Sequence, residues 1–294
     1  MLQQTRMEVV LGYFARFVAR FPTVRALAEA PEEDVLAAWS GLGYYRRARM
    51  LREGAIAVVE RFGGEVPRRV DQLLTIPGIG RYTAGAIASI AHERKVPIVD
   101  GNVARILARV FLIREPPLRE AWRRAEELVG ACESPRDFNQ GLMELGALVC
   151  KPLNPSCDVC PLRADCAAFA AGCVDEVPVR EAKKETRTLR IPLYLIKDGR
   201  GRILMRRGSG TLMNAMFHLP HGNNALLDAP PLEASAGRLL GTFRHTVTTR
   251  RIEFSLYAAE LAHIPRDYTW VDPASMTEVP HPSYVRKALK LAAL

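Results

Sequence analysis

Hydrophobic side chains recur at helical spacing throughout the first half of the chain. Between residues 9 and 18 they return every three or four positions, which predicts the apolar face of an amphipathic helix. Prolines and glycines separate the segments that follow, as expected at helix ends. Further helices are predicted at residues 24–30, 31–40, 44–62, 69–75, 81–91, 102–113, 119–131 and 135–150. We expect no strand before about residue 185.

The pattern changes after that point. Short apolar runs and alternating apolar and polar residues replace the helical spacing, which is typical of strands. Strands are predicted at 189–196, 203–207 and 251–261, and a helix at 283–292. Asp198-Gly199, between the first two strands, is a strong hairpin signal. The charged stretch 176–189 predicts a linker between an all-α domain at 1–175 and an α+β domain at 190–294.

Composition and charge narrow the class of protein. With 294 residues, of which 48% are hydrophobic and 25% charged, the chain is long enough for two folded domains. No apolar run reaches the roughly 18 residues of a membrane span, and the first residues lack the layout of a signal peptide. We therefore expect a cytoplasmic, intracellular protein with no membrane partner.

The net charge of +9 is unevenly distributed. Residues 1–175 carry 23 Lys and Arg against 21 Asp and Glu, whereas residues 176–294 carry 18 against 11. A basic chain favours polyanionic partners because it neutralises phosphates and releases their counterions. An arginine-rich soluble protein would show the same balance, so charge alone leaves both interpretations open.

Four of the six cysteines lie close together, with the spacing C-x6-C-x2-C-x5-C. They are Cys150, Cys157, Cys160 and Cys166. A disulfide framework is typical of secreted chains, and nothing here marks one. Four thiolates within 17 residues can instead surround one soft metal centre. The spacing favours a [4Fe–4S] cluster over zinc, because zinc sites usually pair two short hooks and only Cys157 and Cys160 form one.

The run from Leu73 to Ala84 predicts a helix, a Pro-Gly-x-Gly turn and a second helix. Gly78 and Gly80 allow a tight turn and close approach of another molecule, and the N-terminus of the second helix can hold a phosphate. Such a hairpin grips a DNA backbone without reading its sequence, although a plain tight turn between core helices has the same pattern.

A second polar group follows the apolar stretch 96–99. Asn102 is the expected N-cap of the next helix, and Asp100 is expected near the positive end of that helix. An aspartate at such a position most often only caps the helix.

The hairpin, Val99–Val103 and the four cysteines, in this order, resemble the helix-hairpin-helix/Gly-Pro-Asp DNA glycosylase superfamily. Met1–Thr5 and Gly41–Tyr45 resemble its adenine DNA glycosylase (MutY) branch. The resemblance covers 1–175. It implies a multidomain protein, with an all-α helix-hairpin-helix glycosylase domain that holds the hairpin at 73–91. The same resemblance implies an iron–sulfur loop at 150–166, whose four cysteines hold a [4Fe–4S] cluster.

The resemblance implies a base-excision repair enzyme, a DNA N-glycosylase that removes adenine mispaired with 8-oxoguanine or guanine in double-stranded DNA. Asp100 is then the catalytic carboxylate, Tyr82 lies beside it, and Asn102 orients Asp100 or its water. Lyase relatives have a nucleophilic lysine at the position of Tyr82. Because a phenol cannot form a Schiff base, a monofunctional enzyme is expected. The residues implied to contact DNA are Gln3, Gln4, Tyr44, Gly78, Gly80 and Arg81.

One residue of the family pattern falls before Met1 and is therefore not in the given sequence. The family has a catalytic glutamate two residues before the methionine that here is Met1. This acid protonates the departing adenine, and a general acid typically contributes about 10²–10⁴-fold. Either the true start lies upstream, which we expect, or the chain is a truncated or degenerate copy. As written, the chain is expected to be weak or inactive.

The second domain resembles the Nudix-like C-terminal domain of the same family, through Ile203–Arg207 and Met216–Pro220. A magnesium-binding Nudix box is absent from its sequence, so it is expected to bind rather than hydrolyse. The family reads 8-oxoguanine through a Phe-Ser-His loop. Here Phe243, Arg244 and His245 are the corresponding residues, with arginine in place of serine.

Two other functions are compatible with the sequence. The first is a related mismatch glycosylase that acts on another base, although such relatives lack a Nudix-like domain. The second is a non-catalytic mismatch-binding protein, which the missing glutamate favours and the retained Asp100 and Tyr82 oppose. In each case we expect a monomer that associates with the nucleoid.

Overall fold

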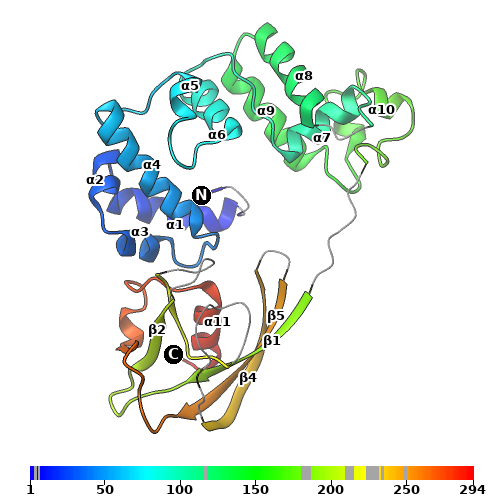
Figure 1. Ribbon diagram of the computed structural model, residues 1–294. Coiled ribbons are helices and arrows are strands. Elements are labelled where there is room, and N and C mark those ends of the chain that lie inside the picture. The colour runs from blue at the N-terminus through cyan, green and yellow to red at the C-terminus, as the bar shows by residue number, and fades with distance from the viewer. Residues whose placement is uncertain are drawn as a thin grey trace. The chain divides into compact units, whose positions relative to one another are not determined.

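The computed structural model describes residues 1–2, 5, 7–114, 118–179, 187–208, 215–222, 232, 235–247 and 250–294, without the side chains of 187, 235 and 236. The chain forms two compact units (Figure 1). Unit 1 consists of Met1–Gly64 together with Lys184–Leu294, and unit 2 consists of Glu65–Lys183. None of the described helices is long and apolar enough to cross a membrane.

Unit 1 begins with four helices at the predicted places. They are α1 (Met7–Arg20), α2 (Val24–Glu29), α3 (Glu32–Trp39) and α4 (Arg46–Phe62). Thr23 caps α2 by accepting a hydrogen bond from the amide of Ala26, and Gly63 ends α4 in the left-handed conformation. Phe17, Leu36 and Trp39 are buried in the core between these helices.

In its described residues, the rest of unit 1 contains two three-stranded sheets and one helix. The first sheet has the order β1 (Arg187–Leu195), β5 (Arg250–Glu260), β4 (Ser235–Val247), with β1 parallel to β5. The second has the order β3 (Phe217–His218), β2 (Ile203–Arg207), β6 (Tyr268–Val271). A short 3-10 turn, η3 (Pro273–Ser275), leads toward the closing helix α11 (Ser283–Leu291), which packs on the first sheet.

Two expectations about this part are corrected. The hairpin at Asp198-Gly199 forms only at its turn, where the amide of Leu204 donates to the carbonyl of Ile196. Beyond the turn the two strands enter different sheets, because β1 pairs with β5 and β2 pairs with β3 and β6. The stretch 243–245, expected as a loop, lies inside strand β4.

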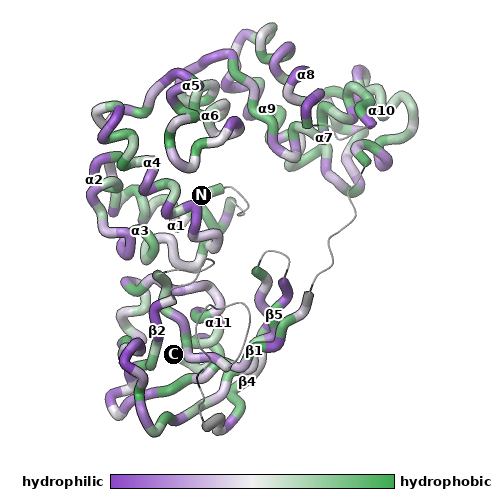
Figure 2. Tube along the Cα trace, in the orientation of Figure 1, coloured by the Kyte–Doolittle hydropathy of each residue, from purple (hydrophilic) through white to green (hydrophobic). Residues whose placement is uncertain are grey.

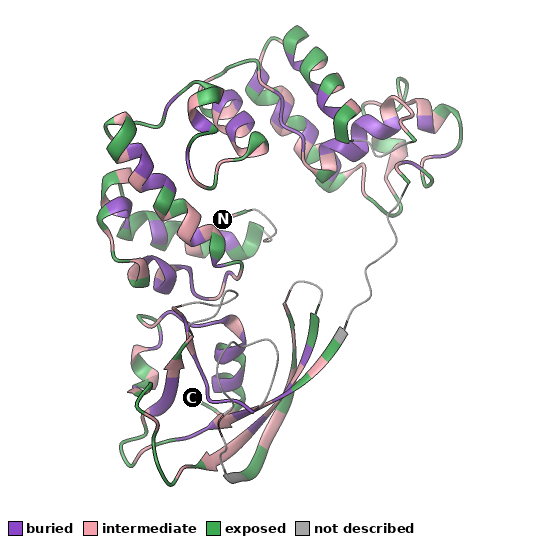
Figure 3. Cartoon of the chain, viewed as in Figure 1, coloured by how far each residue is buried: buried purple, intermediate pink, exposed green. Residues whose placement is uncertain are grey.

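Unit 2 is helical in its described residues. Its elements are α5 (Val70–Leu73), α6 (Arg81–Ala86), the π-helical turn η1 (Ile87–Ala91), α7 (Gly101–Val110), α8 (Leu118–Ala131), α9 (Pro135–Leu148), the 3-10 turn η2 (Cys157–Val159) and α10 (Ala167–Ala170). Helix α7 packs against α8, α9 and α10 and is buried along most of its length (Figure 3). Apolar and polar stretches alternate along the trace, as amphipathic packing requires (Figure 2).

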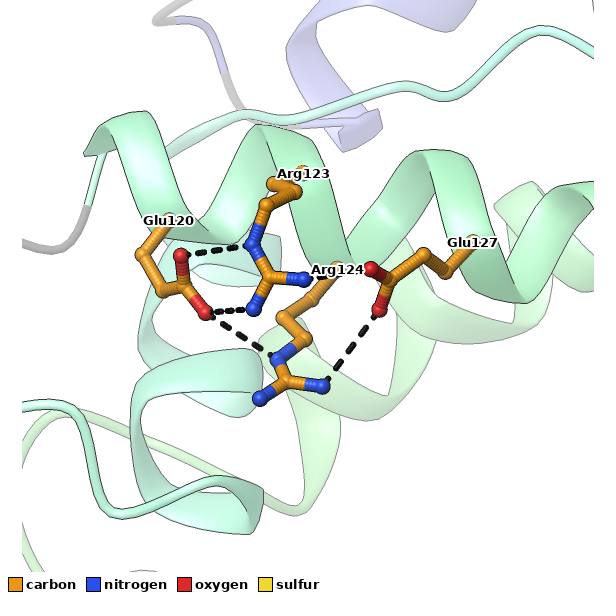
Figure 4. A network of polar contacts seen from close by, with 4 residues as sticks. All are labelled: Glu120, Arg123, Arg124 and Glu127. Atoms are coloured by element: carbon orange, nitrogen blue, oxygen red, sulfur yellow. Dashed lines mark hydrogen bonds and ion pairs between the residues drawn. The ribbon is translucent and has the colours of Figure 1, made fainter.

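The outer side of α8 carries a closed network of charges (Figure 4). Arg123 and Arg124 each pair with both Glu120 and Glu127, three or four residues away on the same helix. Two arginines therefore face two glutamates, and this surface has no surplus of positive charge to offer a polyanion.

Candidate active site and cysteine cluster

Asp100 lies at the N-terminus of α7. Its Oδ1 accepts a hydrogen bond from the amide of Val103 at 2.8 Å, so Asp100 is the N-cap and the helix begins at Gly101. The expected cap, Asn102, lies instead inside the first turn, which corrects that prediction. Capping holds the carboxylate at the positive end of the helix dipole and leaves it half-buried.

Tyr82, near the start of α6, lies within electrostatic range of Asp100. Burial and the negative charge of Asp100 both raise the pKa of the Tyr82 phenol. Its hydroxyl donates to Sδ of Met143 at 3.6 Å, a weak bond to a soft acceptor. The structure therefore brings together two of the predicted residues, a carboxylate and a phenol that stays protonated at neutral pH.

The predicted hairpin is a tight turn between α5 and α6. The amide of Ile79 donates to the carbonyl of Ile76 at 3.1 Å, and Gly78 has φ +80°. This is the position of a type II turn at which a side chain would be strained. Gly78 and Gly80 are exposed. Arg81, predicted to contact DNA, has its guanidinium 3.8 Å from the ring centre of Trp122.

Asn102 takes part in a different contact from the one expected. Its Oδ1 accepts a hydrogen bond from the buried guanidinium of Arg105 at 2.9 Å. Arg105 also donates to the carbonyls of Gly146 at 2.7 Å and Cys150 at 2.8 Å. A Cβ on Gly146 would lie 2.7 Å from Cβ of Asn102, so only glycine lets α9 come this close to α7.

Arg105 was not found by sequence reasoning. The sequence did contain a signal for it: Arg105 and Arg109 lie four residues apart on the largely apolar helix α7, which places both on one face. Arg109 is 2% exposed, and it donates to the carbonyls of Val177 and Lys151 and to Sγ of Cys150 at 3.2 Å. Buried guanidinium groups need such partners, so these bonds fix the segment around Cys150 against α7.

The four predicted ligands line one shared pocket that opens to solvent. The remaining walls are largely apolar and include Val149, Phe169 and Val174. Burial, and then the neighbouring thiols, raise the pKa of Cys157. Four thiolates crowded together are therefore unfavourable without a cation among them.

The donor set consists of four thiols around one space, which suits a soft metal centre. Among the described residues, no three His, Cys, Asp or Glu side chains are arranged to hold one metal ion. Nevertheless Cys150, Cys157, Cys160 and Cys166 surround a shared space, and Arg109 directs an N–H at the sulfur of Cys150. Charge-assisted bonds to cysteine sulfur tune iron–sulfur centres in general.

In unit 1, Tyr44 is exposed and has φ +49°, which is unusual for a residue with an aromatic side chain. The indole N–H of Trp39 holds the loop by donating to the carbonyl of Gly43. Arg47 stacks beside Tyr44 and donates to the carbonyl of Met1 and the hydroxyl of Thr5. Arg47 therefore connects the start of the chain with the Tyr44 loop, whereas Gln3 and Gln4 are outside the described residues.

The predicted lesion-reading residues divide between the two faces of β4. The ring of Phe243 lies 5.2 Å from that of Phe254, and the ring of His245 lies 6.1 Å from that of Tyr284, on the α11 side. Burial, together with the charge of Lys287, lowers the pKa of His245 to about 4. Arg244 is on the opposite face, where it pairs with Glu253.

Three kinds of comparison bear on this arrangement. Residues 1–131 match the HhH-GPD superfamily of base excision DNA repair proteins. The chain is 49% identical over 174 residues to adenine DNA glycosylase of Rattus norvegicus, covering 57% of this chain and 34% of that protein. It is 38% identical over 188 residues to adenine DNA glycosylase of Buchnera aphidicola, covering 63% of this chain and 54% of that protein.

Solved structures show the same helical fold. A thermostable thymine-DNA glycosylase aligns with a TM-score of 0.54 and 28% identity, covering 58% of this chain and 80% of that one. The alignments to the curated relatives span between about a third and about half of those proteins. Through its helical part, the chain is therefore similar to the HhH-GPD superfamily of base excision DNA repair proteins, and its curated relatives there are adenine DNA glycosylases.

Proposed function

We propose that this protein is a monofunctional DNA N-glycosylase that removes adenine mispaired with 8-oxoguanine or guanine in double-stranded DNA. The observation that carries the proposal is Asp100, which is held as the N-cap of α7 within electrostatic range of Tyr82 on α6. It occurs in a chain that is 49% identical over 174 residues to an adenine DNA glycosylase.

The chemistry follows from the charges at this site. When adenine leaves, positive charge develops on the sugar, and the carboxylate of Asp100 stabilises it or bonds to it. The amide of Val103 fixes one carboxylate oxygen, so the group is oriented before the reaction. Tyr82 keeps its proton and supplies no amine, so hydrolysis is expected without strand cleavage.

Two other regions have roles in DNA binding in this proposal. The exposed turn at Gly78 and Gly80 presents backbone amides to a phosphate, and Arg81 adds a positive charge beside it. Tyr44, with Gln3 and Gln4, enters the stack next to the mispair while the adenosine is flipped out. The strained φ of Tyr44 supports this role, since such strain is typical of functional sites.

Cys150, Cys157, Cys160 and Cys166 would hold a [4Fe–4S] cluster, which would fix the loop between α9 and α10. Arg109 would balance part of the negative charge by its bond to Cys150. We also propose that the chain divides into an all-α domain at 1–175 and a Nudix-like domain at 190–294. In this proposal the second domain reads the lesion with Phe243, Arg244 and His245.

The test is single-turnover excision on a duplex with one 8-oxoguanine:adenine pair, with thymine:guanine and fully paired duplexes as controls. Excision of adenine alone supports the proposal, and excision of thymine favours the related mismatch glycosylase. Mispair binding without excision favours a non-catalytic binding protein. The same assay on a form extended upstream with glutamate two residues before Met1 tests the general acid that the resemblance implies. Size-exclusion chromatography tests the proposed monomer, and cell fractionation the intracellular location.

A further inference from the structure

The loop between α3 and α4, residues 40–45, carries Tyr44, and we call it the wedge loop after the role proposed for that residue. Tyr44 has φ +49° and is 48% exposed, so its own side chain does little to hold this conformation. Strained backbone persists only where the surrounding structure fixes it. The contacts of the loop with the rest of unit 1 therefore determine how Tyr44 is presented.

The segment that leads into α11 contacts the wedge loop through buried hydrogen bonds. The backbone amide of His281 donates to Oγ of Ser40 at 3.1 Å, and the carbonyl of His281 accepts from the hydroxyl of Tyr45 at 3.2 Å. All three residues are buried. Burial raises the pKa of Tyr45 to about 12, so the phenol keeps the proton that it donates. The two bonds therefore fix both ends of the loop against one residue.

Arg286, in the first turn of α11, contacts the same loop from the solvent side. Its guanidinium donates to the carbonyl of Ser40 and to the hydroxyl of Tyr13, both at 3.0 Å. The Tyr13 hydroxyl in turn donates to the carbonyl of Ser40 at 3.0 Å. A Cβ on Gly41 would clash with this hydroxyl and would lie 2.9 Å from Nη1 of Arg286. Gly41, with φ +103°, therefore allows this close approach.

The same turn of α11 also contacts β4. Nζ of Lys287 donates to the carbonyl of Arg244 at 3.0 Å, and the ring of Tyr284 lies 6.1 Å from that of His245. Arg244 and His245 are among the residues proposed to read the lesion. Because Tyr284, Arg286 and Lys287 lie within one helical turn, α11 connects this part of β4 with the wedge loop.

We propose that the segment 281–286 positions the wedge loop, through the backbone of His281 and the side chain of Arg286, so that Tyr44 is presented to the mispair in a fixed conformation. The inference rests on the proposed function for the role of Tyr44 and adds a route from β4 to that residue. Arg286 is here a positioning residue that acts through Ser40 and touches no DNA. A loop that is held before binding loses less conformational entropy when its side chain enters the base stack.

The test is a double-variant cycle on duplex binding by the full chain. Fluorescence anisotropy would give the Kd for a labelled duplex with 8-oxoguanine opposite 2′-fluoroadenosine, which resists excision, and for a fully paired duplex. Arg286→Met removes two charged hydrogen bonds, so affinity for the mispaired duplex should fall about 5-fold or more. Affinity for the fully paired duplex should stay within about 2-fold, since the side chain meets no phosphate.

The cycle shows whether Arg286 acts through the wedge. In a Tyr44→Gly background the ring is absent, so Arg286→Met should change mispair affinity by less than about 2-fold. Arg286→Lys keeps one donor and should restore part of the loss. Tyr45→Phe removes the bond to His281 and should weaken mispair binding as Arg286→Met does. Melting temperatures of all variants show that they fold.

Arg207→Ala is the matched control. Arg207 of β2 pairs with Glu33 of α3, so this substitution removes another contact between the first four helices and the rest of unit 1, outside the wedge loop. Affinity for the mispaired duplex should stay within about 2-fold of the parent. An equal loss of affinity in Arg207→Ala and Arg286→Met would overturn the inference, because any contact between these parts would then have the same effect.

The outcomes also separate this inference from the proposed function. Equal weakening of both duplexes by Arg286→Met would indicate a direct phosphate contact, and an undiminished effect in the Tyr44→Gly background would place its action elsewhere. Either result overturns the inference. Unchanged mispair affinity in Arg286→Met, in a chain that excises adenine, leaves the proposed function standing alone. A loss that depends on Tyr44, in a chain that never excises adenine, supports the positioned wedge and counts against the enzyme.

Discussion

The guanidinium of Arg109 donates a hydrogen bond to the sulfur of Cys150, 3.2 Å away, and so connects the core of α7 to the cysteine pocket. Arg109 also satisfies the carbonyls of Lys151 and Val177, which would lose their partner if the side chain changed. The arginine is therefore both part of the core and a neighbour of the proposed cluster.

Replacement of Arg109 by methionine should lower the free energy of unfolding by about 2–4 kcal/mol, because the buried carbonyl of Val177 and the partly buried carbonyl of Lys151 lose a charged donor. Urea denaturation measures this loss. Arg94→Met, at an exposed position in the same unit, is the control and should change stability by less than about 0.5 kcal/mol. Equal effects of the two substitutions would contradict the structural role of Arg109.

Substitution of Cys157 by serine should abolish the brown colour and the absorbance near ~400 nm that a [4Fe–4S] cluster gives. Cys157 lines the pocket with the other three cysteines, so its loss removes one ligand. Cys132→Ser, outside the pocket, should keep the colour. A colourless parent protein that contains zinc would overturn the proposed cofactor.

Replacement of Asp100 by asparagine should abolish excision while duplex binding and stability stay close to those of the parent. Asparagine is as good an N-cap as aspartate, so the bond to Val103 is retained and only the negative charge is lost. Ser134→Ala removes the cap of α9, which costs about 1 kcal/mol, and should leave excision intact. Loss of binding in Asp100→Asn would assign Asp100 a structural role only.

Tyr44→Gly should not lower the stability of unit 1, because glycine adopts the positive φ of this position without strain. Tyr44 is 48% exposed, so little buried surface is lost. Binding to a mispaired duplex should weaken if the ring enters the base stack. Tyr44→Ala, which also removes the ring but keeps a Cβ at positive φ, should weaken binding equally and unfold more readily. Unaltered mispair affinity in both variants would exclude a wedge at this position.

His245 should make stability fall on acidification. Its folded pKa of about 4 is below its ordinary value of 6.5, so the unfolded chain binds more protons between these two pH values. Stability from this group is therefore complete above pH 6.5 and is lost as the pH falls toward about 4. Because His245 is partly exposed, we expect a loss of about 1 kcal/mol.

Denaturation at a series of pH values shows whether the free energy of unfolding falls on acidification, as predicted. His245→Gln should reduce the fall, although it should not remove it, since burial also lowers the pKa of His221 and His281. A steeper fall in His245→Gln than in the parent would show that the histidine is protonated more readily in the folded protein.

Hydrophobic spacing by itself determined the helical half of the chain. The helices predicted at 44–62 and 119–131 are found as α4 and α8, within three residues of the expected ends. The predicted 81–91 is found as α6 followed by η1. These elements follow from the sequence because each amphipathic face and each cap depends on residues within one or two turns. The close spacing of Cys150, Cys157, Cys160 and Cys166 likewise predicted that the four side chains lie around one site, and they line one pocket.

Only the tertiary structure decided the features that depend on distant residues. Strand β4 was missed because register shifts at Leu239 and Gly241 break its alternation, and its pairing partner is supplied by β5. The choice of Asp100 over Asn102 as cap was settled by Arg105, whose bonds to Asn102, Gly146 and Cys150 hold the asparagine inside the first turn.

The contacts of the wedge loop have the same origin. Ser40 and Tyr45 bond to residues of the segment 281–286, which lie between 236 and 246 positions away, and local sequence carries no information about such partners. Helix α11 is placed by burial of its apolar face, which includes Tyr284 and Val285, against the first sheet, and the contacts of Arg286 on its exposed side follow from it.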